Sequence, residues 1–168
     1  MAATNPVVEL ITRDIVTKID AITEDNGFNQ DLNAVRPMRL GNDAGVSLVN
    51  GVVIVHQDDP DVSELDADKG AAGLKAWIQP YALECFVIQD DLTPGDTGTP
   101  IDTLINRVKA DIEKKLMEDH TRGGNAIETR LDGSMKFVDE GNATITGIVV
   151  FVSVQYRVKL TDPYSEQA

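Results

Sequence analysis

The sequence has one cysteine, few aromatic residues and a shortage of basic side chains. Cys85 is the only cysteine of the 168 residues, which excludes an intrachain disulfide and a structural zinc site built from several thiolates. It lies in the apolar run LECFVI, which is typical of a buried, unreactive thiol. Aromatic residues make up only 5% of the chain, so the core is expected to be aliphatic.

Acidic residues outnumber basic residues by 28 to 15, and the formal net charge is −13. A surface of this charge repels phosphate groups, which argues against tight or sequence-specific nucleic-acid binding and against docking on anionic lipid. No stretch approaches the ~20 apolar residues of a membrane-spanning helix, and the N-terminal sequence lacks the features of a signal peptide. We therefore expect a soluble protein made in a reducing cytoplasm, with no membrane partner.

Two amphipathic helices are predicted from apolar residues that recur every three or four positions. Asn5 and Pro6 begin the first helix, and Gly27 supplies its stop signal. Thr99 is predicted to cap the second helix and Pro100 to take its first position, whereas HTRGGN ends it. The stripe of the first helix comprises Val8, Ile11, Ile15, Ile19 and Ile22. The stripe of the second comprises Ile101, Leu104, Ile105, Val108, Ile112 and Leu116.

Three apolar segments predict strands between the helices. NAVRPMRL supplies a short edge strand, because Pro37 cannot donate a ladder hydrogen bond. VSLVNGVVIVH is either a hairpin that turns at Asn50-Gly51 or one interrupted strand. KAWIQPYALECFVIQ predicts a long strand in which Pro80 marks a bulge or an edge position.

A hairpin is predicted after the second helix. Its first strand is SMKFVDE, its turn lies at Gly141-Asn142, and Gly147 marks a bulge in its second strand. That last strand alternates strictly, which is typical of one buried and one wet face. The residues of its buried face are Val152, Val154, Tyr156, Val158 and Leu160.

Two segments carry no periodic pattern. Residues 57–73, QDDPDVSELDADKGAAG, are predicted to form a long acidic loop. Residues 161–168, TDPYSEQA, follow the last strand, which should stop before Pro163. This C-terminal arm is either a frayed end or an arm that docks on another subunit through Tyr164.

The order of these elements predicts one domain over residues 1–168. Its fold class is α+β, with a largely antiparallel or mixed sheet and two helices packed on one face. The sequence shows no internal repeat and no linker that would divide it.

No catalytic motif can be assembled from the residues. The two histidines, His56 and His120, have no matching nucleophile motif, and the glycines of TRGGN follow a helix instead of preceding one. The acidic segment offers oxygen ligands, but counting from Asp58 places Ser63 at the sixth position and Lys69 at the twelfth, so the EF-hand spacing fails. We expect no enzyme activity, no cofactor and no metal. A cation- or ligand-binding module that uses this loop and His56 remains an alternative.

Three blocks follow one another along the chain: ITRDIVTKIDAIT…GF, LINRVKADIEKKLMEDHTRGG and VSVQYRVKLTDPY. In this order they resemble the tail terminator (tail-completion or minor tail) proteins of long-tailed bacteriophages. Two short motifs carry most of the resemblance. The first is the helix exit D-x-T-R-G-G, formed by Asp119, Thr121, Arg122, Gly123 and Gly124. The second is the ending Y-R…D-P-Y, formed by Tyr156, Arg157, Asp162, Pro163 and Tyr164.

This resemblance implies a structural virion protein that forms a ring, expected to be hexameric, at the head-proximal end of the tail tube. Such a ring stops tube polymerisation and offers a surface to the head, and DNA passes through it without specific binding. The implied partners are further copies of the chain, the tail tube protein and a head–tail connector or head-closure protein. The residues expected at a subunit or tube interface are Arg122, Arg157, Asp162 and Tyr164. Another neck component, such as a head-closure protein, is the alternative. The acidic composition predicts a negative channel wall.

Overall fold

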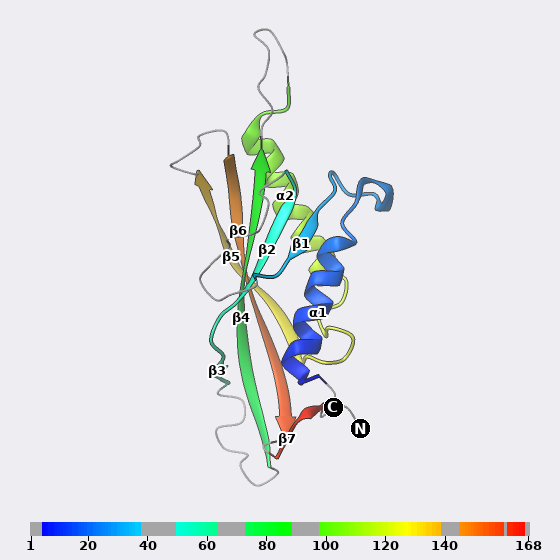
Figure 1. Ribbon diagram of the computed structural model, residues 1–168, viewed down its shortest axis with the longest axis vertical. Coiled ribbons are helices and arrows are strands. Elements are labelled where there is room, and N and C mark those ends of the chain that lie inside the picture. Colours follow the sequence, from blue (N-terminus) through cyan, green and yellow to red (C-terminus); the bar gives the residue numbers. More distant parts are fainter. Residues whose placement is uncertain are drawn as a thin grey trace.

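Two long antiparallel strands run through the middle of the fold. β4 (Leu74–Ile88) and β6 (Ile145–Lys159) pair along their whole lengths without a register shift (Figure 1). The computed structural model describes residues 5–37, 50–63, 73–88, 98–138, 145–159 and 161–166. The long strand predicted around Pro80 and the final strand are both confirmed.

The other strands extend this pair on both sides. β2 (Val52–Gln57) lies antiparallel to β4, β1 (Asn33–Val35) lies parallel to β2, and β5 (Glu128–Val138) lies antiparallel to β6. The order is therefore β1-β2-β4-β6-β5, with β3 (Asp61–Val62) also paired to β4 and β7 (Asp162–Glu166) to β6. The sheet is mixed, because the β1–β2 pair is parallel. The short edge strand predicted near Pro37 is confirmed as β1.

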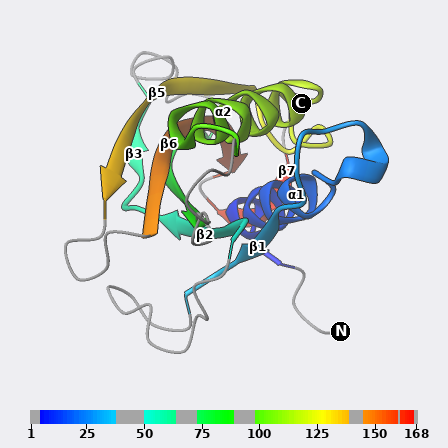
Figure 2. The same cartoon turned by 90° about the horizontal axis from the view of Figure 1, so that it is seen from above.

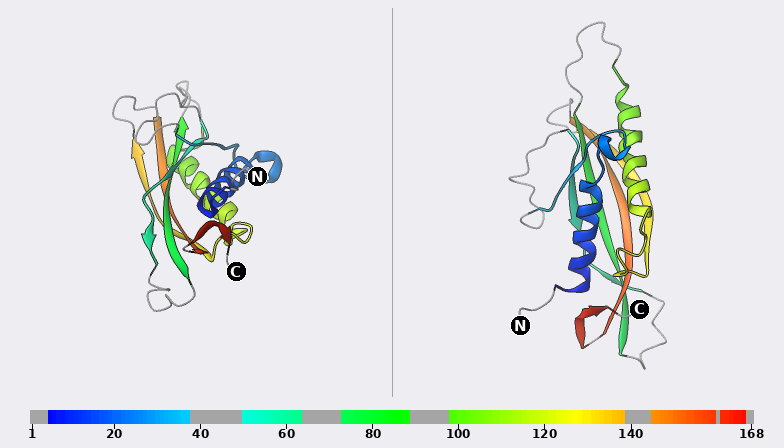
Figure 3. Two further views of the ribbon diagram at one scale, coloured as in Figure 1. Left: turned by 60° about the horizontal axis from the view of Figure 1, so that its bottom comes forward. Right: turned by 90° about the vertical axis from the view of Figure 1, so that its right-hand side faces the viewer.

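The sheet curls into a half-barrel whose concave face holds both helices. α1 (Val7–Asp20) and α2 (Ile101–Met117) lie side by side inside the curve and run in opposite directions (Figures 2 and 3). One continuous core joins the apolar faces of both helices to alternate residues of β2, β4 and β6. This confirms the α+β class with two helices on one face. The buried valines and tyrosine predicted for the last strand all belong to this core.

The ends of the helices differ slightly from the prediction. Pro6 and Pro100 occupy the N-cap positions with extended ψ angles of 151° and 139°, and neither helix has a side-chain cap. Asn5 and Thr99 therefore do not cap. Gly27, with φ +82°, ends a short 3₁₀ helix, η1 (Glu24–Asn26), and does not end α1, which already stops at Asp20.

Pro80 lies within a central strand, so the predicted edge or bulge position is wrong. The neighbouring strand is interrupted at this point, because β2 ends and β3 begins on either side of it. The buried side chain of Gln79 donates from Nε2 to the carbonyl oxygens of Asp58 and Pro80. A side-chain amide therefore supplies hydrogen bonding where proline has no N–H to donate.

The β5–β6 hairpin is confirmed, but its bulge lies elsewhere. Gly147 pairs in register with Phe86 on β4 and with Phe137 on β5, so the bulge predicted at Gly147 is wrong. The register shifts instead between Leu131 and Gly133 on β5, where Gly133 has φ +128°. The predicted Gly141-Asn142 turn lies outside the described residues, as does the segment before Asn50 that would make the first arm of a second hairpin.

The chain folds back after β6 instead of ending loosely. β6 stops at Lys159, before Pro163 as predicted, and Leu160, the last residue of the predicted buried face, lies outside the described residues. β7 then pairs antiparallel with β6, Asp162 opposite Lys159 and Glu166 opposite Val158. The Asp162 carboxylate accepts a hydrogen bond of 3.1 Å from the Tyr164 backbone, which supports the tight return. The described part of the C-terminal arm therefore forms a strand of the chain's own sheet instead of a frayed end.

The acidic segment 57–73 is not one continuous loop. Its first part completes β2 and forms the short strand β3. Residues 64–72 lie outside the described part of the chain. Ser63 and Gln155 hydrogen-bond through their side chains beside β3. This contact explains why Gln155 is buried on the β6 face that was predicted to be wet.

Candidate functional sites

Arg122 lies in the interior of the protein, which corrects its prediction as a contact to another subunit. The residue is fully buried. Its Nε donates to Thr129 Oγ1 at 2.9 Å, Nη1 to Asp14 Oδ2 at 3.3 Å, and Nη2 to the Leu116 carbonyl oxygen. Burial lowers the pKa of the guanidinium, and the charge of Asp14 opposes that shift. The side chain therefore joins α1, the end of α2 and β5 within one chain.

Asp119 holds the turn that follows α2, which we call the exit turn (residues 118–126). Its carboxylate accepts hydrogen bonds from Thr121 Oγ1 at 2.8 Å and from the Gly123 backbone at 2.7 Å. The Thr121 hydroxyl is the main cause that lowers the pKa of Asp119. Arg122, Gly123 and Gly124 have φ values of +52°, +68° and +87°. The D-x-T-R-G-G sequence therefore builds a left-handed turn around a carboxylate and a buried guanidinium.

The other three predicted interface residues lie on the β6–β7 hairpin, at the end where both strands turn (Figure 3). Arg157 is half-buried on β6, opposite Ala76 of β4. Asp162 begins β7, and the Tyr164 side chain is 44% exposed. Of the predicted set, Tyr164 has the exposure that a contact with another molecule needs.

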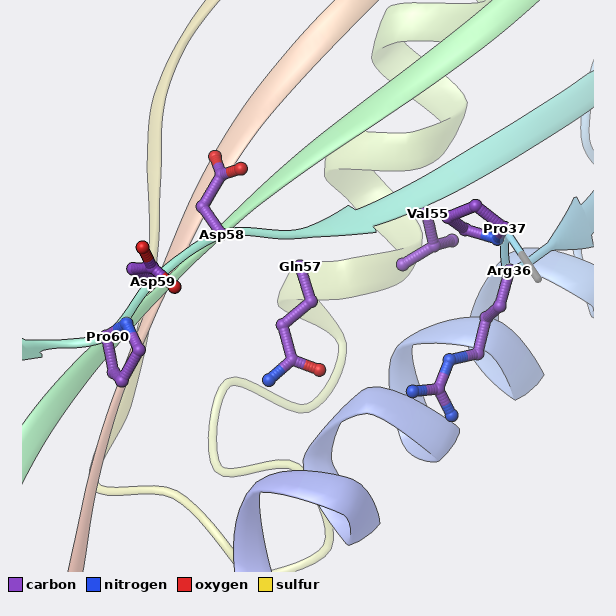
Figure 4. A pocket seen from close by; sticks show the side chains of 7 residues that line it. All are labelled: Arg36, Pro37, Val55, Gln57, Asp58, Asp59 and Pro60. Atoms are coloured by element: carbon purple, nitrogen blue, oxygen red, sulfur yellow. The ribbon is translucent and has the colours of Figure 1, made fainter. Parts of the chain in front are cut away.

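A cavity of about 320 Å³ lies between α1 and the ends of β1 and β2 (Figure 4). Arg36 and Gln57 extend toward α1, whereas Asp58 and Asp59 point the other way. Arg36 Nη1 also pairs with Glu9 Oε1 at 2.9 Å, and this hydrogen bond is the main cause that lowers the pKa of Glu9. Within the described residues, the carboxylates of the acidic segment belong to no group of three or more side chains that could hold a metal ion. The cavity is lined by Arg36, Pro37, Val55, Gln57, Asp58, Asp59 and Pro60.

A buried polar network lies next to this cavity. Thr12 Oγ1 is 2.9 Å from Tyr81 Oη and 3.3 Å from Gln57 Oε1, and Gln57 Nε2 donates to Gln79 Oε1 at 3.3 Å. These groups occupy the core face of α1, β2 and β4. Each polar atom finds a partner inside the protein, so the network holds α1 against the sheet.

Alkaline pH is expected to unfold the protein through Tyr81 and Cys85. Burial raises the pKa of Tyr81 above its ordinary value of 10, and it raises the pKa of Cys85 to about 12 from 9. In the unfolded chain both side chains lose their protons at their ordinary pKa values. In the folded chain burial keeps them protonated at the same pH. The free energy of unfolding should therefore fall as pH rises above about 9, by up to ~1.4 kcal/mol per pH unit and group.

Urea unfolding between pH 7 and 11 measures this loss. Tyr81→Phe removes one ionising group, so the free energy of unfolding should decline less steeply above pH 10. The variant should still fold, because the Thr12 hydroxyl keeps its hydrogen bond of 2.8 Å to the Val8 carbonyl oxygen. An equal decline in Tyr81→Phe and the wild type would contradict this origin.

The described residues bring His56 to Glu84 and not to the acidic carboxylates. His56 Nε2 lies 3.2 Å from Glu84 Oε2, and both side chains are 27% exposed on the outer face of β2 and β4. Across the described residues, no group of three or more His, Cys, Asp or Glu side chains could hold a metal ion. The remaining acidic residues of the segment, Glu64, Asp66 and Asp68, lie outside those residues.

An apolar surface surrounds β5, and the sequence did not single it out. A second cavity, of about 310 Å³, opens between the start of α2 and the end of the β5–β6 hairpin, with Val138 60% exposed at its rim. Residues 130–136 and 138 of β5 are exposed, whereas Thr129 is buried. Alternation was the only signal that could have found it, and the bulge after Leu131 breaks that alternation. The cavity is lined by Ile101, Asp102, Ile105, Lys136, Phe137, Val138 and Thr146.

Sequence comparisons with known proteins found no match, either to a model of a protein family or to a curated protein. Within the described residues, no helix is long and apolar enough to cross a membrane.

Proposed function

We propose that the protein is a tail terminator of a long-tailed bacteriophage, which assembles as a ring at the head-proximal end of the tail tube. The ring, of six copies, stops tube polymerisation and gives the head its joining surface. It works by binding and makes or breaks no covalent bond. The observation that carries the proposal is the ordered resemblance of three sequence blocks to such proteins.

The structural role of the resembling motifs supports the proposal. Asp119, Thr121 and Arg122 form the exit turn that ties α2 to α1 and β5. Tyr156 faces the core, and Asp162 begins the β7 return. The residues that carry the resemblance therefore hold elements of this fold together, which fits a protein with an architectural role. No residue of either motif belongs to a set of converging nucleophiles, acids and bases.

Charge gives a second argument. A ring crossed by DNA benefits from a wall that does not hold phosphates, and a chain of net charge −13 supplies such a wall. Acidic side chains are therefore expected to line the channel. A basic channel wall in the assembled ring would contradict this part of the proposal.

Tube growth tests the function. The tail tube protein of the same phage is polymerised in the presence of increasing amounts of this protein, and tube lengths are measured by electron microscopy. A terminator shortens the tubes in proportion to its amount, because each bound ring closes one growing end. Unchanged tube lengths at saturating amounts would overturn the proposal. Growth arrest by a purified head connector, but not by this chain, would favour the alternative of a head-closure protein.

Tyr164→Ala should weaken this arrest about tenfold, because an exposed aromatic side chain near the centre of a contact commonly contributes more than 1 kcal/mol. Met117→Ala is the matched control. Met117 is 43% exposed, close to the 44% of Tyr164, but lies on a different element, at the C-terminal end of α2. Equal arrest by Tyr164→Ala and Met117→Ala would remove Tyr164 from the contact while leaving the terminator function in place.

A further inference from the structure

The second cavity lies where three elements meet at one end of the molecule. The first turns of α2, the last residues of β5 and the first residues of β6 surround it (Figure 1). Its volume is about 310 Å³. This is the room of about ten water molecules at ~30 Å³ each. A space of this size accepts a small molecule and is too small for a helix of a partner protein.

Most of the cavity wall is apolar. Ile101 and Ile105 contribute to it from α2, and Val138 contributes from β5. Ile105 is only 5% exposed and belongs to the core, whereas Val138 is 60% exposed. An apolar ligand in this space would remove its own surface and that of Val138 from water together, which is the main source of affinity for such ligands.

Val138 and Lys136 lie on the helix side of the sheet. From Gly133 to Val138 the pairing of β5 with β6 is regular, with Lys136 opposite Ile148 and Val138 opposite Thr146. Ile148 belongs to the core beneath the helices. Because opposed residues share a face of a sheet, Lys136 and Val138 lie on that face too. The register shift of β5 comes before this stretch and leaves it regular.

Two charged residues of opposite sign, Asp102 and Lys136, line the cavity. Neither forms an ion pair with the other or with any other described residue. Asp102 lies in the first turn of α2, where the partial positive charge of the helix end compensates its carboxylate. Lys136 is exposed on a strand and has no such compensation. The cavity therefore offers one unmatched positive charge beside an apolar wall.

We propose that this cavity binds an aliphatic monocarboxylate, with its hydrocarbon chain between α2 and β5 and its carboxylate at Lys136. The volume suits a chain of roughly eight to ten carbon atoms. The net charge of −13 repels anions at long range. Salt screens that repulsion beyond about 8 Å at physiological ionic strength, whereas the contact with Lys136 acts at short range and favours an anionic head group.

The site is independent of the proposed ring. Tyr164 lies on the β6–β7 hairpin, and the cavity lies at the other end of β6 (Ile145–Lys159). The 15 residues of β6 separate the two places by about 45 Å along the strand. Binding of a carboxylate and arrest of tube growth can therefore be measured separately. A bound chain contacts both α2 and β5, so it should raise the midpoint of thermal unfolding.

A chain-length series tests the proposal on the unmodified protein. Isothermal titration calorimetry measures the binding of hexanoate, octanoate, decanoate and dodecanoate. The dissociation constant should fall about fourfold for each added CH₂ group until the cavity is full, at about ten carbon atoms, and then level off. No binding of octanoate at about 10 mM would overturn the proposal. So would a dissociation constant that keeps falling through dodecanoate, because that is the behaviour of an open apolar surface.

Two tryptophan variants locate the hydrocarbon chain. Val138→Trp fills the opening and should weaken octanoate binding at least about tenfold, the loss of roughly two CH₂ contacts. Met135→Trp is the matched control. Met135 is 56% exposed on the same strand, but it lies an odd number of residues from Val138 in the regular stretch and so on the opposite face. Equal binding by the two variants would overturn the proposal.

Two lysine variants locate the carboxylate. Lys136→Gln should weaken octanoate binding about fivefold, the upper value for an exposed ion pair, and leave the gain per CH₂ group unchanged. Lys114→Gln is the control, because it removes the same charge from an exposed position near the other end of α2. It should bind octanoate as the wild type does. Equal losses in the two variants would show a general effect of charge and overturn the assignment of the head group to Lys136.

Discussion

Replacing Arg122 with methionine is expected to lower the free energy of unfolding by about 3–5 kcal/mol, the range for breaking a buried ion pair by removing one partner. Methionine fills a similar volume but donates no hydrogen bond. The Asp14 carboxylate then loses its counter-charge, and the Leu116 carbonyl oxygen loses a donor inside the protein. Thr129 suffers less, because its hydroxyl keeps a hydrogen bond of 2.8 Å to the His120 carbonyl oxygen.

Arg130→Met is the control for this prediction. Arg130 lies on β5 and pairs with Glu128, but its side chain is 62% exposed. An exposed pair of this kind contributes about 0.2–1 kcal/mol. The positive φ of residue 122 is strained for arginine and methionine alike, so it cancels in the comparison. Urea unfolding gives both values. Equal losses in the two variants would show that Arg122 is not the buried link described above.

Adding one methyl group at Gly147 is expected to cost about 3 kcal/mol, at the upper end of the range for overpacking a well-filled site. A Cβ atom there would meet the carbonyl oxygen of Cys85 and the ring of Phe137. The ring is itself held edge-on against Phe86, with centroids 5.4 Å apart. The Cys85 carbonyl belongs to the central ladder between β4 and β6, so it cannot move aside cheaply.

Two further variants separate the causes. Gly27→Ala tests backbone strain alone, because Gly27 has φ +82° and no atom lies within 4 Å of an added Cβ. It should cost about 1 kcal/mol. Phe137→Ala combined with Gly147→Ala frees the ring contact but leaves the backbone contact, so the double variant should remain less stable than Phe137→Ala. Chemical unfolding that shows Gly147→Ala no worse than Gly27→Ala would contradict the packing at this site.

Periodic segments could be predicted from the sequence because the pattern and the burial have the same cause. The alternation from Val152 to Val158 reports one face against the core, and that face is buried. The apolar stripes also predicted both helices. In α1 the first buried residue is Val7 and not the predicted Val8. Long amphipathic elements carry this information within a few neighbouring residues.

Features that depend on distant partners could not be predicted. The turn-rich tail became β7 because it finds a free stretch of β6, and composition alone gave no sign of that pairing. Arg122 was expected at a subunit or tube interface because of the resemblance, but it is buried, and its partner Asp14 lies 108 residues away in sequence. Asp111 is buried for a similar reason, since it accepts two hydrogen bonds of 2.8 Å from Asn29.

Pro80 shows a third kind of limit. Proline was expected at an edge or bulge because it lacks a donor, and the chemistry behind that expectation holds. In the structure the missing N–H of Pro80 is accommodated inside the sheet. The neighbouring strand is interrupted there, and the Gln79 side-chain amide donates hydrogen bonds instead. A local rule identified the problem at this residue, but the solution involves β2, β3 and β4 together.

The most direct measurement of the central claim is electron microscopy of finished tail tubes mixed with this protein. The account predicts added density at one end of each tube, sixfold symmetry in end-on averages, and bare tube walls. Binding along the walls, or no binding at saturating concentration, would contradict a terminating ring.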